Sequence, residues 1–444
     1  MIKKKFDKLL NFIKNSHLEI FSCFLLLLWT ISPLVEYILK CFNTKFYTHY
    51  FSTIIYIIGS FGFLIYIIYF IKFKKKEKLN IKKFIPELLL FVLLIISIIA
   101  TILSDNPHLS FFGEIYRKEW LLVYIVYIGI ILLSSTIKND KYIKYLSLSI
   151  IIICLLITIN PLFSKNFNYL EFSNVFHNSN HYAYYLMINI ILTIFMFLNS
   201  NKLIKKIIYI LIYVFLLYFL IRNNTFGSYL AILGTLVFLF MYSMIKKYER
   251  RKIIFIVIAF IITSYIGSNY YIKIGEGIYR EKTRGIVSNN ISILKNDITG
   301  FIDKDEFVIE NAGNRRGILW KEAWKYTLNH PVFGGGMECL KNYYISDRKE
   351  YYSFHNDRPH SVILQTSSFI GIPGAIIYLA FIIYIALSNL TIIKKNTFHI
   401  MIYCTAMCYF ASSLVGNSMY YTSPYFMILL GILVGFNRCK KERK

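Results

Sequence analysis

The feature that most constrains this chain is a series of uninterrupted apolar runs, each about 17 to 25 residues long. At a rise of about 1.5 Å per residue, a helix of that length crosses the hydrocarbon core of a bilayer, which is about 30 Å thick. Helices and strands that border a soluble core show an amphipathic stripe or an alternation, and these runs mostly show neither. With an apolar content of 56% over 444 residues, they predict an all-α polytopic membrane protein.

Twelve such runs predict about twelve transmembrane helices. They cover residues 18–39, 50–71, 84–103, 119–137, 143–160, 182–198, 205–221, 226–245, 252–270, 374–390, 398–416 and 421–437. The basic N-terminal run is followed by no small-residue cleavage site, which predicts an uncleaved anchor. We expect three regions: helices 1 to 9 in 1–270, an extracytoplasmic loop domain with interfacial helices in 271–373, and helices 10 to 12 with a basic cytoplasmic tail in 374–444.

The position of the basic residues explains the net charge of +26. The short loops assigned to the cytoplasm, together with the termini, hold about thirty of the 50 Lys and Arg residues, whereas the short outer loops hold about six. This is the positive-inside pattern of membrane proteins, so topology explains the charge and no nucleic-acid partner is expected. The pattern places both termini in the cytoplasm and the long loop outside, for a multi-pass protein of a bacterial cytoplasmic membrane.

Polar residues gather at the predicted outer ends of the helices. Arg117 precedes the fourth span, where an anionic headgroup contact and an interface anchor are equally good interpretations. Asn180 lies beside a tyrosine cluster, a pattern typical of both sugar sites and aromatic belts. Arg222 ends the seventh span, Thr225 can cap the eighth helix, and Gly227 leaves its first turn open to another group. These features favour an anion site, with a snorkelling arginine and an ordinary cap as the alternative.

The long outer loop holds the densest set of reactive side chains. Its segment NRRGILWKEAWKYTLNHP predicts a helix that begins at Asn314, with Arg315 and Arg316 at its head, and ends at His330–Pro331. The face expected to rest on the membrane interface collects Arg316, Trp320, Ala323, Trp324 and Thr327. An arginine at the head of a helix opposes the helix dipole, which favours an anionic partner outside the helix.

A second group of residues follows that helix. Gly334 and Gly336 lie in a triple glycine that predicts a tight, closely approached backbone. Arg358 and His360 open another helical run, which is interrupted at 371–374 by Gly-Ile-Pro-Gly. Histidine exchanges protons near neutral pH, although a histidine at a helix start is often an ordinary polar residue. The seven cysteines show neither CxxC nor Cys/His ligand spacing, and we predict no metal site.

These segments together resemble the core of the O-antigen ligase and polysaccharide polymerase (Wzy-like) superfamily. Its members show an arginine four residues before a tryptophan, a Pro-x-x-Gly-x-Gly run, and a histidine opening a helix that leads to Gly-x-Pro-Gly. The twelve-helix, GT-C-like layout with a large loop before helix 10 is similar too. The resemblance implies that Arg316 and His360 are catalytic and that Arg316 also binds the donor diphosphate.

The resemblance is incomplete at the outer start of helix 8, where the family often carries an arginine that binds diphosphate. Phe226 occupies that position here, so Arg222 or Arg117 is expected to serve instead, with Arg315 beside Arg316. The remaining residues are expected to have supporting roles: Trp320, Gly334, Gly336, Asn180, Thr225, Gly227 and Arg358.

The resemblance implies a glycosyltransferase, independent of metals and cofactors, that transfers or polymerises polyprenyl-diphosphate-linked oligosaccharides at the outer face of the membrane. Its partners would be the lipid-linked donor, a glycan, lipid or protein acceptor, and the bilayer. A surface polysaccharide polymerase is favoured over an O-antigen-type ligase, because the Lys-, Ile- and Asn-rich composition suggests an AT-rich genome and many such bacteria lack an outer membrane. The alternative from another class is a polysaccharide or lipid transporter or flippase, which would need ionisable residues or broken helices near the bilayer midplane.

Overall fold

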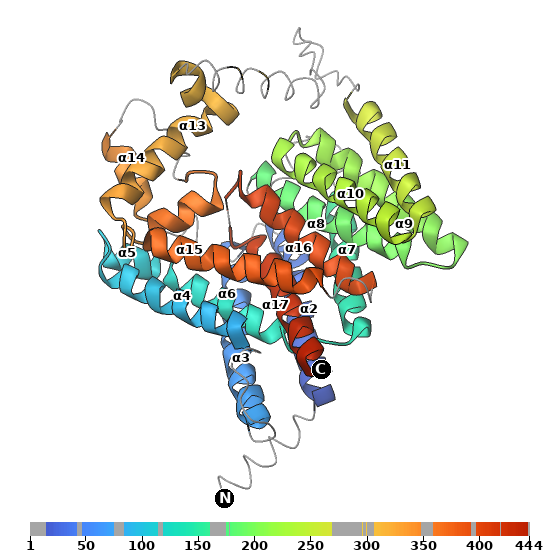
Figure 1. Ribbon diagram of the computed structural model, residues 1–444, viewed down its shortest axis with the longest axis horizontal. Coiled ribbons are helices and arrows are strands. Elements are labelled where there is room, and N and C mark those ends of the chain that lie inside the picture. Colours follow the sequence, from blue (N-terminus) through green and yellow to red (C-terminus); the bar gives the residue numbers. More distant parts are fainter. Residues whose placement is uncertain are drawn as a thin grey trace, which may run out of the picture.

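The computed structural model describes residues 15–41, 47–74, 84–113, 119–159, 175–176, 178–268, 295, 299, 306–347, 358–391, 397–417 and 419–442. Within this part of the chain every regular element is a helix (Figure 1). The first helices are α2 (Asn15–Cys41), α3 (Tyr47–Lys74), α4 (Ile85–Ile102), α5 (Pro107–Phe112), α6 (Leu121–Ser134), α7 (Asp140–Ile159) and α8 (Ser179–Leu198). The others are α9 (Leu203–Arg222), α10 (Phe226–Lys246), α11 (Arg250–Ser268), α13 (Glu306–Asn329), α14 (Leu340–Asp347), α15 (Val362–Leu390), α16 (Thr397–Ser413) and α17 (Ser423–Glu442).

Each expected transmembrane run overlaps one of these helices, and the tenth run forms the second part of α15. Among the described residues, nine helices are long and apolar enough to cross a bilayer. Leu121–Ser134 and Ser423–Arg438 are shorter apolar helices. The all-helical, polytopic membrane class is therefore confirmed, whereas the number of twelve spans and the division into three regions stay predictions.

Small residues let the helix backbones approach one another closely. A Cβ atom added to Gly62 on α3 would overlap the backbone of Gly129 on α6, and one added to Gly59 would overlap Val126. Close contact at glycine is a common way for membrane helices to associate, because van der Waals packing replaces the hydrophobic driving force. α8 forms the centre of the bundle: its membrane-length segment is completely buried against neighbours that include α9 and α16.

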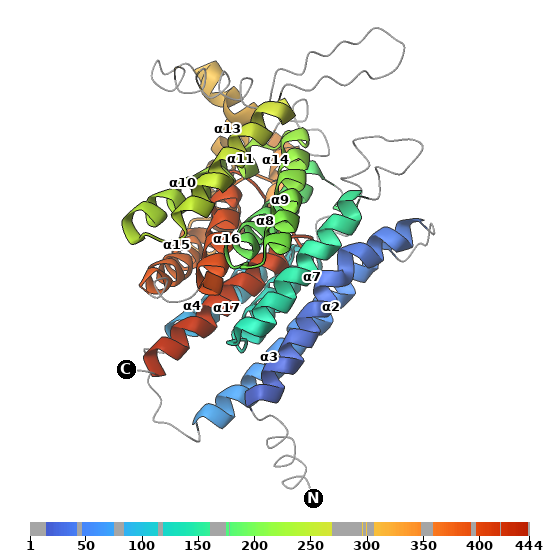
Figure 2. The same ribbon diagram turned by 90° about the vertical axis from the view of Figure 1, so that its right-hand side faces the viewer.

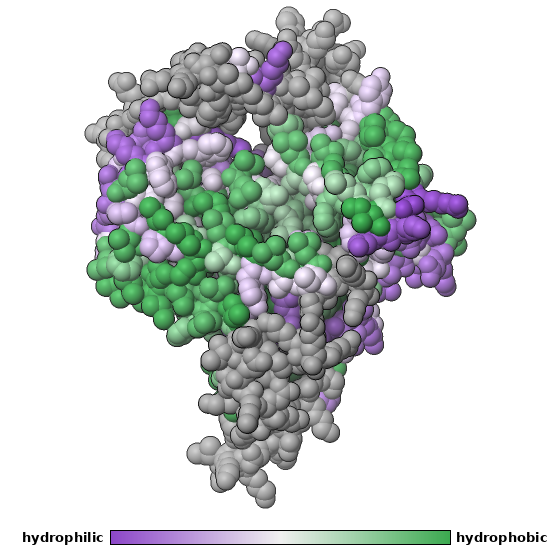
Figure 3. Space-filling view, in the orientation of Figure 1, coloured by the Kyte–Doolittle hydropathy of each residue, from purple (hydrophilic) through white to green (hydrophobic). Residues whose placement is uncertain are grey.

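The outer surface of the bundle is apolar where a bilayer would cover it. Figure 3 shows hydrophobic residues over α4 and hydrophilic residues gathered above them over α13 and α14. The exposed apolar side chains of α4 include Leu88, Phe91, Ile95, Ile98 and Ile102. An apolar surface of this extent indicates contact with lipid. The start of α2 and the end of α17 lie at the opposite end of the molecule from α13 and α14 (Figure 2).

Helix α13 differs from the sequence expectation in its start and in the face that it buries. It begins at Glu306, so Arg316 lies in the helix interior and the argument from the helix dipole does not apply. Ala323 and Thr327 are fully buried, whereas Trp324 is 47% exposed. The predicted interfacial face is therefore wrong for Ala323 and Thr327, because that side of α13 packs on the rest of the protein. The predicted end of the helix is confirmed, since α13 stops at Asn329.

The triple glycine closes a break in α15. Ile370 and Gly371 have non-helical backbone angles, and Pro373 lacks an N–H, so two carbonyl groups of the preceding turn lose their usual partners. The N–H groups of Gly335 and Gly336 replace the missing donors: they donate to the carbonyls of Ser368 at 3.0 Å and Phe369 at 3.2 Å, respectively.

Backbone geometry explains why these positions are glycine. Gly334 has a φ of +70° and Gly336 a φ of +99°, values that favour glycine. A Cβ atom on Gly334 would lie 2.5 Å from the carbonyl carbon of Phe369. The glycine loop therefore fixes the first part of α15, residues 362–369, against the end of α13.

A buried ion pair joins three helices at the far end of the bundle from α13. Arg438 on α17 donates to the carboxylate of Glu87 on α4, and the two side chains are 2% and 11% exposed. The Arg438 guanidinium also lies 5.2 Å from the ring centroid of Tyr66 on α3. A buried guanidinium needs a carboxylate and an aromatic ring of this kind beside it, because removing its charge from water costs free energy.

Candidate functional site

Arg316 reaches from the middle of α13 to the end of α16. Its Nη1 donates to the carbonyl oxygen of Val415 at 2.6 Å. Burial lowers the pKa of the Arg316 guanidinium, and the nearby Tyr184 hydroxyl opposes this only in part. A partly desolvated cation interacts strongly with an anion, because less water competes for it.

His360 approaches the same place from the segment before α15. Its φ of +50° is uncommon for a residue with a side chain. Its Nδ1 lies 3.3 Å from Nδ2 of Asn417. Val415 and Asn417 belong to the turn at residues 414–417, which we call the α16 turn. The two predicted catalytic residues are 44 positions apart, and each contacts this turn.

Three further residues contact the α16 turn or the last turn of α16 just before it. A Cβ atom on Gly227, in the first turn of α10, would lie 3.2 Å from the Val415 side chain. Ser228 Oγ lies 3.2 Å from Ser412 Oγ, and the Tyr184 hydroxyl donates to the carbonyl of Ser412 at 3.1 Å. The starts of α8 and α10 therefore surround the turn that Arg316 and His360 contact.

The predicted capping role of Thr225 is wrong. Thr225 occupies the N-cap position of α10, but its side chain makes no capping hydrogen bond. Its hydroxyl instead accepts from Asn223 Nδ2 at 2.9 Å and donates to the Asn223 carbonyl at 3.3 Å. Asn223 Nδ2 also donates to the carbonyl of Ser179 at 2.7 Å, which joins the end of α9 to the start of α8. Arg222, the last residue of α9, is half-buried, and its role as an anion ligand stays a prediction.

Arg358 is part of a buried ionic network two residues before His360. Its Nη2 donates to Oε1 of Glu338 at 2.6 Å, with the side chains 2% and 4% exposed. The same Glu338 oxygen accepts the backbone N–H of Glu119 at 3.1 Å, and the Arg358 guanidinium lies 5.2 Å from the ring centroid of Phe369. These contacts give Arg358 a structural function in holding the segment that carries His360.

The other predicted residues lie around this centre or outside the described structure. Asn180 is in the first turn of α8, and its N–H donates to the capping side chain of Asn178 at 2.7 Å. Trp320 is half-buried, and its indole nitrogen has no hydrogen-bond acceptor in the described part of the chain. Arg117 lies outside the described residues, and so does the side chain of Arg315.

Sequence reasoning missed three residues that organise the site. Asn417 lies in the polar stretch between the last two predicted spans, and Tyr184 lies in the tyrosine cluster at the start of the sixth; both stretches stand out in the sequence. Glu338 follows the triple glycine and carries a φ of +64°. No group of three or more His, Cys, Asp or Glu residues in the described segments could hold a metal ion.

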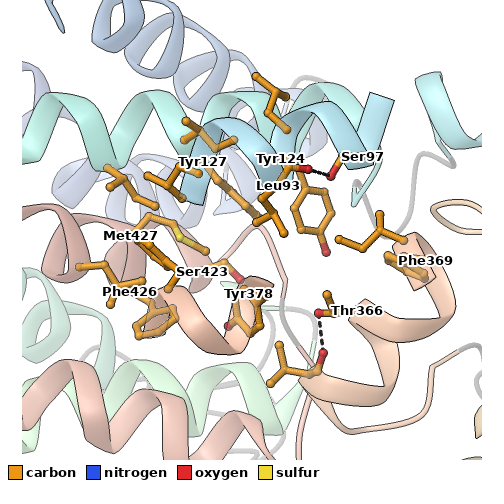
Figure 4. Close-up of a pocket in the computed structure, with 18 of the residues that line it drawn as sticks. Leu93, Ser97, Tyr124, Tyr127, Thr366, Phe369, Tyr378, Ser423, Phe426 and Met427 are labelled. Carbon is orange, nitrogen blue, oxygen red and sulfur yellow. Dashed lines mark hydrogen bonds between the residues drawn. The ribbon is translucent and has the colours of Figure 1, made fainter. Parts of the chain in front are cut away.

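An apolar cavity adjoins the α16 turn. It is lined by residues of α4, α6, α15, α16 and α17. Val362, two residues after His360, and Ser413, just before the turn, are among the lining residues. Tyr124 and Thr366 face each other across it (Figure 4). The site thus combines a partly desolvated cation with an adjoining apolar cavity.

Comparison with known families finds a match. Residues 211–379 match the family model described as O-antigen ligase. The matched segment contains Arg316 and His360 but ends before the α16 turn. No curated protein sequence matches the chain significantly. Over residues 211–379 the chain is therefore similar to the O-antigen ligase family.

Proposed function

We propose that this protein is a membrane glycosyltransferase that moves an oligosaccharide from a polyprenyl diphosphate to an acceptor hydroxyl. The observation that carries the proposal is the convergence of Arg316 and His360 on the α16 turn. The family match supports enzymatic glycan transfer in a membrane. The donor, the acceptor and the residue roles below are our inferences.

The proposed reaction breaks the bond between the anomeric carbon and the diphosphate oxygen and forms a bond to the acceptor oxygen. The acceptor hydroxyl loses its proton, and the polyprenyl diphosphate leaves with its bonding electron pair. Negative charge grows on the diphosphate, so Arg316 is assigned to bind and stabilise it. The lowered pKa of Arg316 supports this role, since a poorly solvated guanidinium gains more from an anionic partner.

His360 is assigned to orient the acceptor hydroxyl and take its proton. The side-chain amide of Asn417 lies against Nδ1 of His360. It therefore determines which ring nitrogen can accept the proton of the acceptor hydroxyl. With the amide nitrogen toward Nδ1, the neutral ring carries its proton on Nε2 and can only donate there. A half-turn of the amide presents its oxygen to an N–H at Nδ1, and Nε2 then becomes the base.

The apolar cavity supports a lipid-linked donor. It adjoins both the segment that begins with His360 and the end of α16, through Val362 and Ser413. A polyprenyl chain placed there would leave its diphosphate at the α16 turn. The position of α13 and α14, opposite the start of α2 and the end of α17 (Figure 2), supports an active face outside and termini inside.

The proposed function is tested by reaction in vitro. Purified protein in lipid nanodiscs receives an undecaprenyl-diphosphate oligosaccharide, and the products are separated by size. We expect a ladder of lengthened glycans for a polymerase, and its loss in Arg316→Ala and His360→Ala. Arg251→Ala, at the other end of the bundle, is the matched control. An unchanged ladder in both site variants contradicts the assigned roles, and a wild-type protein that lengthens no glycan contradicts the proposed polymerase.

A further inference from the structure

A second apolar groove lies on the other side of the bundle from the cavity. It is lined by residues of α7, α9 and α11, and its void, open mouth included, is about 1020 Å³. Figure 1 shows α4 and α15 on the left of the molecule and α9 and α11 on the right. The two apolar spaces therefore have no helix in common.

Arg222 follows the last α9 residue that lines this groove by one helical turn, although it is not itself part of the lining. Leu211, Phe215 and Tyr218 line the groove from α9, and Arg222 is the last residue of that helix. These four positions follow the spacing i, i+4, i+7 and i+11, which places them on one face of a helix. Arg222 thus continues the lining face by one turn, at the end where α9 meets the start of α8 through Asn223.

The distance along α9 from the start of the groove to Arg222 matches the thickness of one leaflet. Arg222 is eleven positions after Leu211, which at a rise of about 1.5 Å per residue is roughly 16 Å. Half of the hydrocarbon core is about 15 Å thick. A chain along α9 would therefore fill one leaflet and place its headgroup at Arg222, where a guanidinium binds phosphate well.

We infer that this groove, with Arg222 at its end, binds a second polyprenyl-phosphate lipid, the one that carries the acceptor glycan. The inference rests on the proposed function, because a polymerase joins two lipid-linked glycans and needs a place for each lipid. The helix that follows Arg222 leads to the site: α10 begins at Phe226, and Gly227 abuts Val415 in the α16 turn. A sugar attached to the lipid phosphate would extend toward His360.

The test measures lipid binding without turnover. Full-length protein in phosphatidylcholine nanodiscs is incubated with undecaprenyl phosphate carrying a photoreactive diazirine on its chain, and the labelled peptides are mapped. We expect saturable labelling of α7, α9 and α11. Arg222→Gln, which removes the cation, and Val214→Trp, which fills the groove, should each weaken it on the order of tenfold. The matched controls Arg251→Gln and Val237→Trp, which lie outside the groove, should leave it unchanged.

Three competitors distinguish the possible occupants. Uncharged polyprenol, phosphatidylglycerol and inorganic phosphate should each compete poorly with the probe. Equal competition by phosphatidylglycerol would mean that the groove holds bulk lipid, and equal competition by polyprenol would mean that Arg222 is not used; either result overturns the inference. Labelling confined to the α4–α15 cavity overturns it as well. Photolabelling measures lipid binding and requires no glycan transfer. A negative labelling result therefore overturns the acceptor-lipid groove without bearing on the proposed transferase activity.

Discussion

Breaking the Arg358–Glu338 pair should destabilise the protein strongly. The two side chains are 2% and 4% exposed and their charged atoms lie 2.6 Å apart. Glu338→Ala leaves a buried guanidinium without its carboxylate, and such a change costs about 3 to 5 kcal/mol. The backbone N–H of Glu119 loses its 3.1 Å acceptor as well, which adds about 1 kcal/mol. We therefore expect Glu338→Ala to lower the free energy of unfolding by about 4 to 6 kcal/mol.

The assay is equilibrium unfolding in mixed detergent micelles, followed by the midpoint in sodium dodecyl sulfate. Glu338→Gln keeps a hydrogen-bond acceptor and should lose less than Glu338→Ala. The double variant Arg358→Met/Glu338→Leu removes both charges and should recover most of the loss, because a buried pair replaced by apolar groups costs little. A loss below about 1 kcal/mol in Glu338→Ala, or a double variant as unstable as the sum of the single ones, would refute the reasoning.

Three further predictions concern other contacts in the structure. Gly371 has a φ of +77° and lies against the neighbouring loop backbone, so Gly371→Ala should lower the free energy of unfolding by more than about 2 kcal/mol in the detergent titration. Gly234 has open space around it, so Gly234→Ala should leave the free energy of unfolding unchanged. Asn417→Leu should lower kcat at least about tenfold, because it releases His360, the proposed base. The KM for the donor should be unchanged, and an equal rise in KM would contradict this role. Tyr326→Phe removes a 2.5 Å hydrogen bond to Asp105 and should cost about 1.5 to 3 kcal/mol in the detergent titration; wild-type stability would argue against it.

The helices and the break in α15 could be predicted from the sequence because they depend on local properties. An apolar run long enough to span a bilayer has few alternatives to a helix, since no water satisfies its backbone there. The Gly-Ile-Pro-Gly segment at 371–374 interrupts a helix by its own stereochemistry. The start of α13 was predicted eight residues late, because residues 306–313 show no apolar periodicity in the sequence.

The convergence of the site could not be derived from local pattern. Arg316 and His360 were singled out through the resemblance and their chemistry, but their common contact with the α16 turn depends on how distant helices pack. Asn417 is 57 residues from His360, and no periodicity relates them. Thr225 illustrates the same point, since its hydroxyl bonds to Asn223 although its position is that of a cap.

The central claim is that Arg316 and His360 act on one substrate, and a double-mutant cycle of turnover tests it most directly. Initial rates of glycan transfer are measured for the wild type, Arg316→Ala, His360→Ala and the double variant under identical lipid conditions. Each single change should raise the barrier by about 3 kcal/mol, and the double variant should be little slower than the slower single variant, because the two groups serve the same transition state. Effects that add fully, or wild-type rates in either single variant, would contradict the account.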